Sequence, residues 1–291
     1  MASTMNQSSL NIGIPTKGIR QKYLKHKIFS TLGDLSEFYD FVSIHDDTTT
    51  IMVAKGFVNY NYEIYQSISN TLDSIGQLLK LGRINDAFAL IRKFNDALMI
   101  HVYSMVLAEK EEENLFNDDY SLYDNLVNKW VNGSNRLMEG NEEKEKMKSL
   151  LQVISARDRY LGKILFNKKN RSSYGNKRNT ANDNLHYNTW NTFRLNDSKI
   201  MDYEISLQLL SEANSLIVQL FSIHFSYLTL IKPTIMLSYE NKIPLDDGTF
   251  DDCHRDCAAS FVCELFEKYV ATFDKTLADY LANCTFLRLR Y

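Results

Sequence analysis

Proline and glycine are scarce in this sequence, which has 3 prolines and 11 glycines among 291 residues. Because both residues interrupt or weaken helices, their scarcity leaves room for long, unbroken helical segments. Cysteine is scarce as well, and the four cysteines all lie after residue 250. A disulfide-stabilised secreted protein would be shorter and would distribute its cysteines along the chain, so that class is excluded.

The motifs of several common enzyme classes are missing. The sequence has no glycine-rich phosphate loop, no HExxH and no GxSxG. These absences argue against nucleotide-driven motors, zinc proteases and serine hydrolases. The net charge of −3 also gives the chain as a whole no electrostatic reason to bind nucleic acid or a membrane.

Long uninterrupted apolar runs are missing too. The nearest, residues 215–231, is close to the minimum length of a membrane span and contains Gln219 and His224. These polar side chains favour a buried core helix. The N-terminus has no basic stretch followed by an apolar run, so we expect no signal peptide. The sequence predicts a cytoplasmic protein with no membrane partner.

Helical periodicity is the strongest positive signal. Apolar residues recur at spacings of three and four over 59–110, with a break at Gly82. So short a break predicts an antiparallel helical hairpin. Similar patterns predict three further helices, near 142–166, 198–231 and 253–283. We therefore predict an all-α fold, a bundle of long antiparallel helices with a minor β appendage near the N-terminus.

The chain divides into three parts by pattern. Residues 1–18 are polar and predict a flexible lead-in. Residues 19–56 are mixed, and the β-branched run TTTIMV within them predicts a short strand or hairpin arm. Residues 57–285 form the predicted helical domain. An asparagine-rich insertion at 167–197 interrupts this domain and, having no sustained period, predicts a loop or irregular structure.

The insertion 167–197 has six basic and two acidic residues, a local net charge of +4 on a chain of −3. Such a segment attracts phosphate, and aromatic side chains among the cations can stack on single-stranded bases. The candidate RNA-binding residues are Lys168, Lys169, Arg171, Lys177, Tyr187 and Trp190. A solvated loop whose aromatic side chains dock on the bundle explains the same composition, and this interpretation is favoured over RNA binding.

Within the insertion, the stretch RNTANDNLHYN contains residues suited to metal-independent RNA cleavage. This reaction needs a base that takes the 2′-hydroxyl proton and a cation that stabilises the phosphorane-like transition state. His186 suits the first role, because neighbouring cations favour its neutral form. The planar guanidinium of Arg178 suits the second. Asn179 and Asn182 are the candidates for orienting the pair.

Other polar residues in the helices are candidates for support. Arg92 and Asp96 lie one helical turn apart and can pair, either structurally or behind an active side chain, with the structural role favoured. His101 and His224 fall in apolar helical runs and are expected to be hydrogen-bonded core residues. The run DDCHRDC at 251–257 lacks a second distant ligand pair, so we expect no metal and no cofactor.

The segment TLDSIGQLLKLGRINDAFALIRKFNDAL at 71–98 resembles the first helical hairpin of HEPN-type proteins and of related uncharacterised bacterial helical families. NDNLHYN resembles the later His-containing segment of those families. Arg178 and the asparagine after it match the start of the HEPN ribonuclease motif, and His186 matches its end across a longer interval than usual. The resemblance implies a helical bundle, a homodimer that brings two Arg/His sets together, and a role in bacterial phage defence or toxin systems.

Two function classes stay open on this evidence. One is an RNA-cutting or RNA-binding effector that acts through 167–197. The other is a non-catalytic helical module that binds a protein partner, for instance as the regulator of a toxin, through the hairpin 59–110. Whether Arg178 and His186 meet in a cleft separates the two classes.

Overall fold

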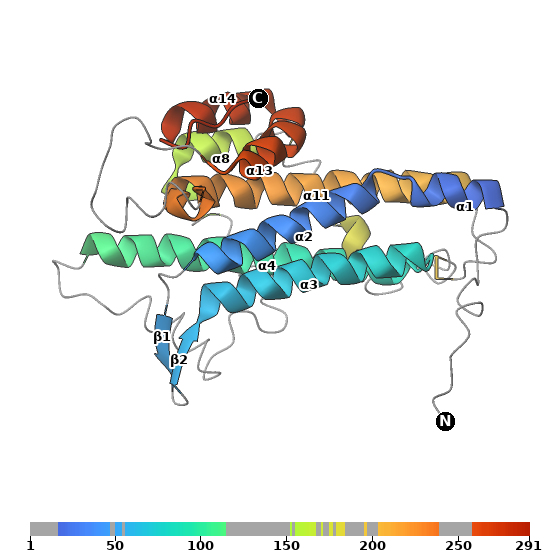
Figure 1. Cartoon of the computed structure of the whole chain (residues 1–291), viewed down its shortest axis with the longest axis horizontal. Helices are drawn as coiled ribbons and strands as arrows, with labels where there is room; N and C mark the ends of the chain where they lie inside the picture. The colour runs from blue at the N-terminus through green and yellow to red at the C-terminus, as the bar shows by residue number, and fades with distance from the viewer. Residues whose placement is uncertain are drawn as a thin grey trace.

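The computed structural model describes residues 17–46, 50–53, 56–114, 155–166, 203–238 and 258–291, with the shorter pieces 152, 170, 175–176, 179–183 and 195–196. Long helices that pack on one another dominate this part of the chain (Figure 1). The longest are α2 (Ile28–His45), α3 (Tyr60–Lys80), α4 (Ile84–Asn114) and α11 (Tyr203–Ile231). The predicted all-α bundle is confirmed.

The hairpin of α3 and α4 follows the sequence prediction closely. The side chain of Asn59 accepts a hydrogen bond from the Tyr62 N–H and caps the start of α3. At the other end Gly82 has a φ of 74°, in the left-handed region. Its N–H donates to the Leu79 carbonyl, and the Arg83 N–H donates to the Leu78 carbonyl, both at 2.9 Å. This pair of bonds ends α3 and reverses the chain in a turn that favours glycine.

The bundle begins earlier in the chain than predicted. Residues 19–56 were expected to be mixed in structure, but α1 (Lys17–Leu24) and α2 are helices, and the inner face of α2 joins the same core as α3 and α11. The signal was present in the sequence, because Ile28, Leu32, Leu35, Tyr39 and Val42 recur at spacings of four and three and are all buried.

The helix α11 fills the centre of the structure. It ends at Ile231, directly before Lys232-Pro233, because proline disfavours a helical residue in front of it. It runs in the same direction as α4: Leu216 lies near Phe88, and further along both helices His224 contacts His101. Phe38 of α2 meets Phe221 of α11 edge to face, with ring centroids 5.2 Å apart.

A small C-terminal group of helices covers α11 on the side away from α3 (Figure 1). One continuous helix was predicted over 253–283, and this is wrong for the described residues 258–291. They form α13 (Ser260–Leu265), a π-helical turn η5 (Phe266–Ala271) and α14 (Lys275–Cys284). The break falls at Asp274, which is not helical and whose carboxylate accepts from the Leu277 N–H to cap α14. The group is completed by α8 (Arg159–Leu165).

A β-hairpin connects α2 to α3. Strand β1 (Thr50–Val53) pairs antiparallel with β2 (Gly56–Asn59), in a register that sets Ile51 opposite Val58. The hairpin projects from the end of the bundle (Figure 1). The strand predicted from TTTIMV is therefore present as the β appendage.

Candidate functional site

The predicted catalytic and RNA-binding residues fall mostly outside the described residues. Of the four catalytic candidates, Asn179 is exposed and Asn182 is half-buried, within a helical stretch at 179–183. The remaining candidates lie outside the described residues: Arg178, His186, Lys168, Lys169, Arg171, Lys177, Tyr187 and Trp190.

Residues 195–196 of the insertion lie against the bundle, at the end where α4 begins. The Leu195 carbonyl accepts from the Ile84 N–H at 3.2 Å. The Asn196 side chain donates to the Asp86 carboxylate at 2.7 Å and accepts from the Asp86 N–H at 3.3 Å. These bonds supply partners for two N–H groups that the first turn of a helix cannot satisfy itself. Contrary to the loop prediction, residues 175–176 and 179–183 are helical, and within them Ala181 is buried.

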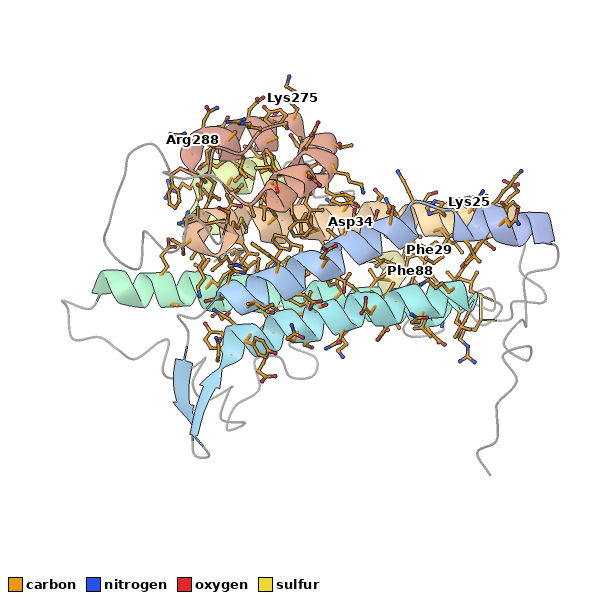
Figure 2. All side chains as sticks on the ribbon, in the orientation of Figure 1. Lys25, Phe29, Asp34, Phe88, Lys275 and Arg288 are labelled. Atoms are coloured by element: carbon orange, nitrogen blue, oxygen red, sulfur yellow. The ribbon has the colours of Figure 1, made fainter. Side chains whose placement is uncertain are left out.

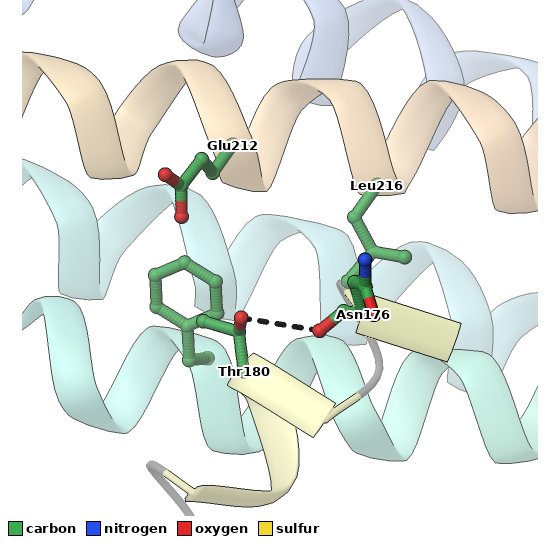
Figure 3. Close-up of a pocket in the computed structure, with 5 residues that line it drawn as sticks. Asn176, Thr180, Glu212 and Leu216 are labelled. Atoms are coloured by element: carbon green, nitrogen blue, oxygen red, sulfur yellow. Dashed lines mark hydrogen bonds between the residues drawn. The ribbon is translucent and has the colours of Figure 1, made fainter. Parts of the chain in front are cut away.

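A pocket of about 200 Å³ opens between this segment and the two long helices (Figure 3). It is lined by Phe88 of α4, by Glu212 and Leu216 of α11, and by Asn176 and Thr180 of the insertion. The Thr180 hydroxyl donates to the Asn176 carbonyl at 3.2 Å, which closes the helical turn on that side. Asn176 and Thr180 of the insertion therefore lie close to both α4 and α11.

The predicted Arg92–Asp96 pair is present on α4. The Arg92 guanidinium donates to the Asp96 carboxylate, which also accepts from the Asn95 side-chain amide at 2.9 Å. The Arg92 side chain is 5% exposed and that of Asp96 27%. Arg92 follows Phe88 by one helical turn on the same face, so the ion pair lies near the part of α4 that lines the pocket.

The histidines of α4 and α11 belong to a buried polar chain that links four helices. His224 Nδ1 lies 2.9 Å from the Tyr39 hydroxyl, and His224 Nε2 lies 2.8 Å from His101 Nδ1. His101 Nε2 lies 3.1 Å from Asn61 Oδ1, and the Asn61 amide donates to Asp46 Oδ2 at 2.9 Å. None of these five side chains is exposed to solvent. The expectation of hydrogen-bonded core histidines is confirmed.

The buried polar chain of hydrogen bonds ends at an ion pair near the surface. Lys232 Nζ lies 3.1 Å from each oxygen of the Asp46 carboxylate, and 19% of the Lys232 side chain is exposed. The Tyr65 hydroxyl donates to Asp46 Oδ2 at 3.3 Å. The Asn59 side chain donates to the Asp46 backbone carbonyl at 2.8 Å. The buried Asp46 carboxylate needs the partners that Asn61, Tyr65 and Lys232 supply, because an isolated carboxylate is very costly to take out of water.

Burial shifts the pKa values of the titratable side chains in the buried polar chain. Desolvation, with a smaller contribution from the Lys232 charge, lowers the pKa of His101 to about 3. Desolvation and the neighbouring His101 lower the pKa of His224 well below its usual value. Desolvation raises the pKa of Tyr39 well above its usual value. At neutral pH all three groups are therefore uncharged.

Because both imidazole rings are neutral, the donor and the acceptor of each hydrogen bond in the buried polar chain can be assigned. Asn61 Oδ1 only accepts, so His101 Nε2 carries the proton and His101 Nδ1 is an acceptor. His224 Nε2 therefore donates to it, which leaves His224 Nδ1 to accept from the Tyr39 hydroxyl. All the donors point from Tyr39 toward the Asp46 carboxylate. Bonds aligned in this way strengthen one another and hold α2, α3, α4 and α11 in one register.

This polar chain is a structural feature, because it is closed to solvent except at Lys232. Sequence reasoning found its histidines but not their partners. Tyr39, Asn61 and Asp46 lie in different elements, and only the packing of the helices brings them together. Among the residues that the structure describes, no three His, Cys, Asp or Glu side chains are placed to hold a metal ion.

Within the described ranges, one helix, α11, is long and apolar enough to cross a membrane, and 78% of its most apolar window is buried inside the protein. Such burial is typical of the core helix of a bundle. Comparison of the chain with protein-family models, curated proteins and solved structures found no match. The class that the fold defines is an all-α helical bundle.

Proposed function

We propose that the protein is an RNA-directed effector of a bacterial defence or toxin system, acting in the cytoplasm through the insertion 167–197. In its catalytic form it is a metal-independent endoribonuclease of the HEPN type. The observation that supports the proposal is the pocket that Asn176 and Thr180 of the insertion form with α4 and α11. Two rigid helices beside the insertion can position catalytic side chains in a fixed geometry, as RNA cleavage requires.

In this proposal His186 takes the proton of the RNA 2′-hydroxyl, and the 2′-oxygen then attacks the adjacent phosphorus. The bond from phosphorus to the 5′-oxygen breaks, and this oxygen takes a proton from water while His186 returns its proton to solvent, which leaves a 2′,3′-cyclic phosphate and a free 5′-hydroxyl. Arg178 stabilises the charge that develops on the phosphate oxygens, since its planar fork grips two of them at once. Asn179 and Asn182 orient these groups, and Arg92–Asp96 supports α4 behind them.

A homodimer fits this proposal, because two copies would bring two Arg178/His186 sets together. The mass in solution, measured by light scattering at micromolar protein concentration, tests this part separately. A dimer mass supports shared sites, and a monomer mass contradicts them.

The function itself is tested by inducing the protein in bacteria and following growth. The parent protein is expected to arrest growth, and His186→Ala to restore it at equal expression. His254→Ala, which removes a histidine outside the insertion, is the matched control and should arrest growth like the parent. Arrest by the parent and by His186→Ala alike would contradict the catalytic role. If the parent does not arrest growth and binds no RNA, the protein-interaction module replaces the RNA-directed function.

A further inference from the structure

Basic residues gather at the end of the bundle where α1 and α2 meet. Lys22, Lys25 and Lys27 are exposed there, and Figure 2 shows Lys25 at this junction. Lys80 and Arg83 are exposed on either side of the turn between α3 and α4. None of these side chains fills the core, so their charges face solvent and any approaching partner.

The two basic groups lie at the same end of the bundle. The hydroxyl of Tyr23 donates to the Leu79 carbonyl at 2.9 Å, which ties α1 to the last turn of α3. His26 Nε2 lies 3.1 Å from the Ser211 hydroxyl, which ties the α1–α2 junction to α11. Lys22 precedes Tyr23 and Lys80 follows Leu79 in the sequence, so the two lysines flank the hydrogen bond between Tyr23 and Leu79.

The charge at this end is positive. Its described side chains include five Lys and Arg residues, Lys22, Lys25, Lys27, Lys80 and Arg83, and three carboxylates, Asp86, Glu204 and Glu212. Asp86 is already hydrogen-bonded by Asn196. The net charge of these side chains is +2, on a chain whose total is −3. So uneven a distribution creates a local positive potential that attracts polyanions.

The basic end is continuous with the insertion. Leu195 and Asn196 bind the first turn of α4, immediately after Arg83. Asn176 and Thr180 lie against Phe88, one turn further along. The described residues Asn176, Thr180, Leu195 and Asn196 of the insertion thus lie at the same end of the bundle as Lys80 and Arg83.

We propose that this basic end, named by Lys22, Lys25, Lys27, Lys80 and Arg83, binds the phosphate backbone of single-stranded RNA and guides it to the insertion. The inference rests on the proposed function and adds a binding surface to it. RNA is favoured over a lipid surface because the cations come from separate elements rather than from one amphipathic face. The exposed amides of Asn176 and Asn179 also offer hydrogen bonds that suit bases.

Leu24, Leu81 and Ile205, 38%, 40% and 51% exposed, are the described large apolar side chains exposed at this end. Three separate apolar side chains at partial exposure are ordinary for a soluble surface and too few to anchor a membrane. Binding to lipid is therefore an alternative for the experiment to detect.

The test compares two variants that lose the same charge. The triple variant Lys22→Gln, Lys25→Gln, Lys27→Gln alters the basic end. The control Lys163→Gln, Lys275→Gln, Arg290→Gln removes three exposed cations from the C-terminal helices and tail, where Figure 2 shows Lys275. The probe is a 2′-O-methylated single-stranded RNA, which keeps the backbone charge but has no 2′-hydroxyl and cannot be cleaved by the proposed reaction.

We expect the basic-end variant to bind this RNA about tenfold more weakly at moderate salt, while the control stays close to the parent. The slope of log affinity against log salt should fall by about 2, because each lost phosphate contact on a single strand contributes about 0.7. Circular dichroism melting checks that both variants are folded. Lys80→Gln/Arg83→Gln provides a second, independent reduction of charge at the same end.

Equal weakening in the two triple variants would overturn the inference, since net charge alone would then explain binding. Unchanged binding in both basic-end variants would overturn it while leaving the proposed function standing. A parent that binds no RNA overturns both. Binding to phosphatidylglycerol vesicles that is lost in the basic-end variant, without RNA binding, would assign this surface to lipid and reject RNA.

Discussion

His101 Nδ1 lies 2.8 Å from His224 Nε2, in a core where neither ring is exposed. One ring donates and the other accepts, so the contact requires both imidazoles to be neutral. Tyr39 at one end and Asn61 at the other fix which ring donates. The register of the helices in the bundle therefore depends on a proton arrangement as well as on apolar packing.

Replacing His101 and His224 together should destabilise the fold by less than the sum of the two single replacements. His224→Leu leaves the Tyr39 hydroxyl and His101 Nδ1 without their partners, which should lower the free energy of unfolding by about 2–5 kcal/mol. His101→Leu acts similarly on Asn61 and His224. In each single variant the remaining histidine lacks its partner, but in the double variant neither histidine is left behind. The loss in free energy of unfolding, measured with urea, should therefore be smaller in the double variant than the sum of the two single losses, by about 1–3 kcal/mol. Strict additivity would contradict the coupling.

Acid should destabilise the protein through the same two residues. The unfolded chain binds protons at histidine near pH 6.5, whereas the pKa of folded His101 is about 3. The free energy of unfolding is therefore highest above about pH 6.5 and falls as the pH decreases toward 3, by about 1.4 kcal/mol per pH unit for His101. The lowered pKa of His224 acts in the same direction. The double His→Leu variant should show a flatter pH dependence over this window, and a slope equal to the parent's would contradict the assignment.

Two glycines should respond to alanine in opposite directions. An added Cβ at Gly33 of α2 meets nothing within 4 Å, so Gly33→Ala should stabilise the helix by about 0.5–1 kcal/mol. Gly82 has a φ of 74°, so Gly82→Ala should cost about 1–2 kcal/mol. Thermal melting of the two variants measures both effects, and a shift of the same sign in both would contradict the turn geometry.

The Arg92–Asp96 pair should stabilise α4 in its packed position. Asp96→Asn keeps the shape of the side chain but removes the charge that the buried guanidinium faces, at a cost of about 2 kcal/mol after allowance for the partial exposure of Asp96. Arg92→Met/Asp96→Leu should be less destabilising than Asp96→Leu alone, because no buried charge remains. Chemical denaturation of the three variants checks this order. The reverse order would show that the pair contributes little.

Much of the fold was predictable from periodicity, and the failures have local causes. The hairpin α3–α4 and the end of α11 at Lys232-Pro233 carry unambiguous helix signals. The helix α2 was not predicted although its apolar residues have the right spacing, because the basic stretch before it and the β-branched run after it are not typical of a core helix. The break at Asp274 has no glycine or proline to announce it, and depends on a cap and a π-helical turn that packing stabilises.

The site was less predictable than the fold. The Arg92–Asp96 pair could be predicted because both residues lie on one helix at a fixed spacing. The contact of His101 with Asn61, and of Asn61 with Asp46, could not be predicted, because tertiary packing alone brings these residues together. The assignment of Arg178 and His186 remains a prediction, as both lie outside the described residues.

The central claim is most directly tested by incubating the purified protein with single-stranded RNA in the presence of EDTA. The parent should cleave the RNA and leave 2′,3′-cyclic phosphate ends, whereas Arg178→Lys and His186→Ala should each lose activity by about a hundredfold or more. Lys168→Gln/Lys169→Gln should weaken binding evenly across sequences and reduce its salt dependence, with cleavage of saturating RNA retained. If the parent cleaves RNA and both Arg178→Lys and His186→Ala cleave it at the parent's rate, the site assignment is contradicted.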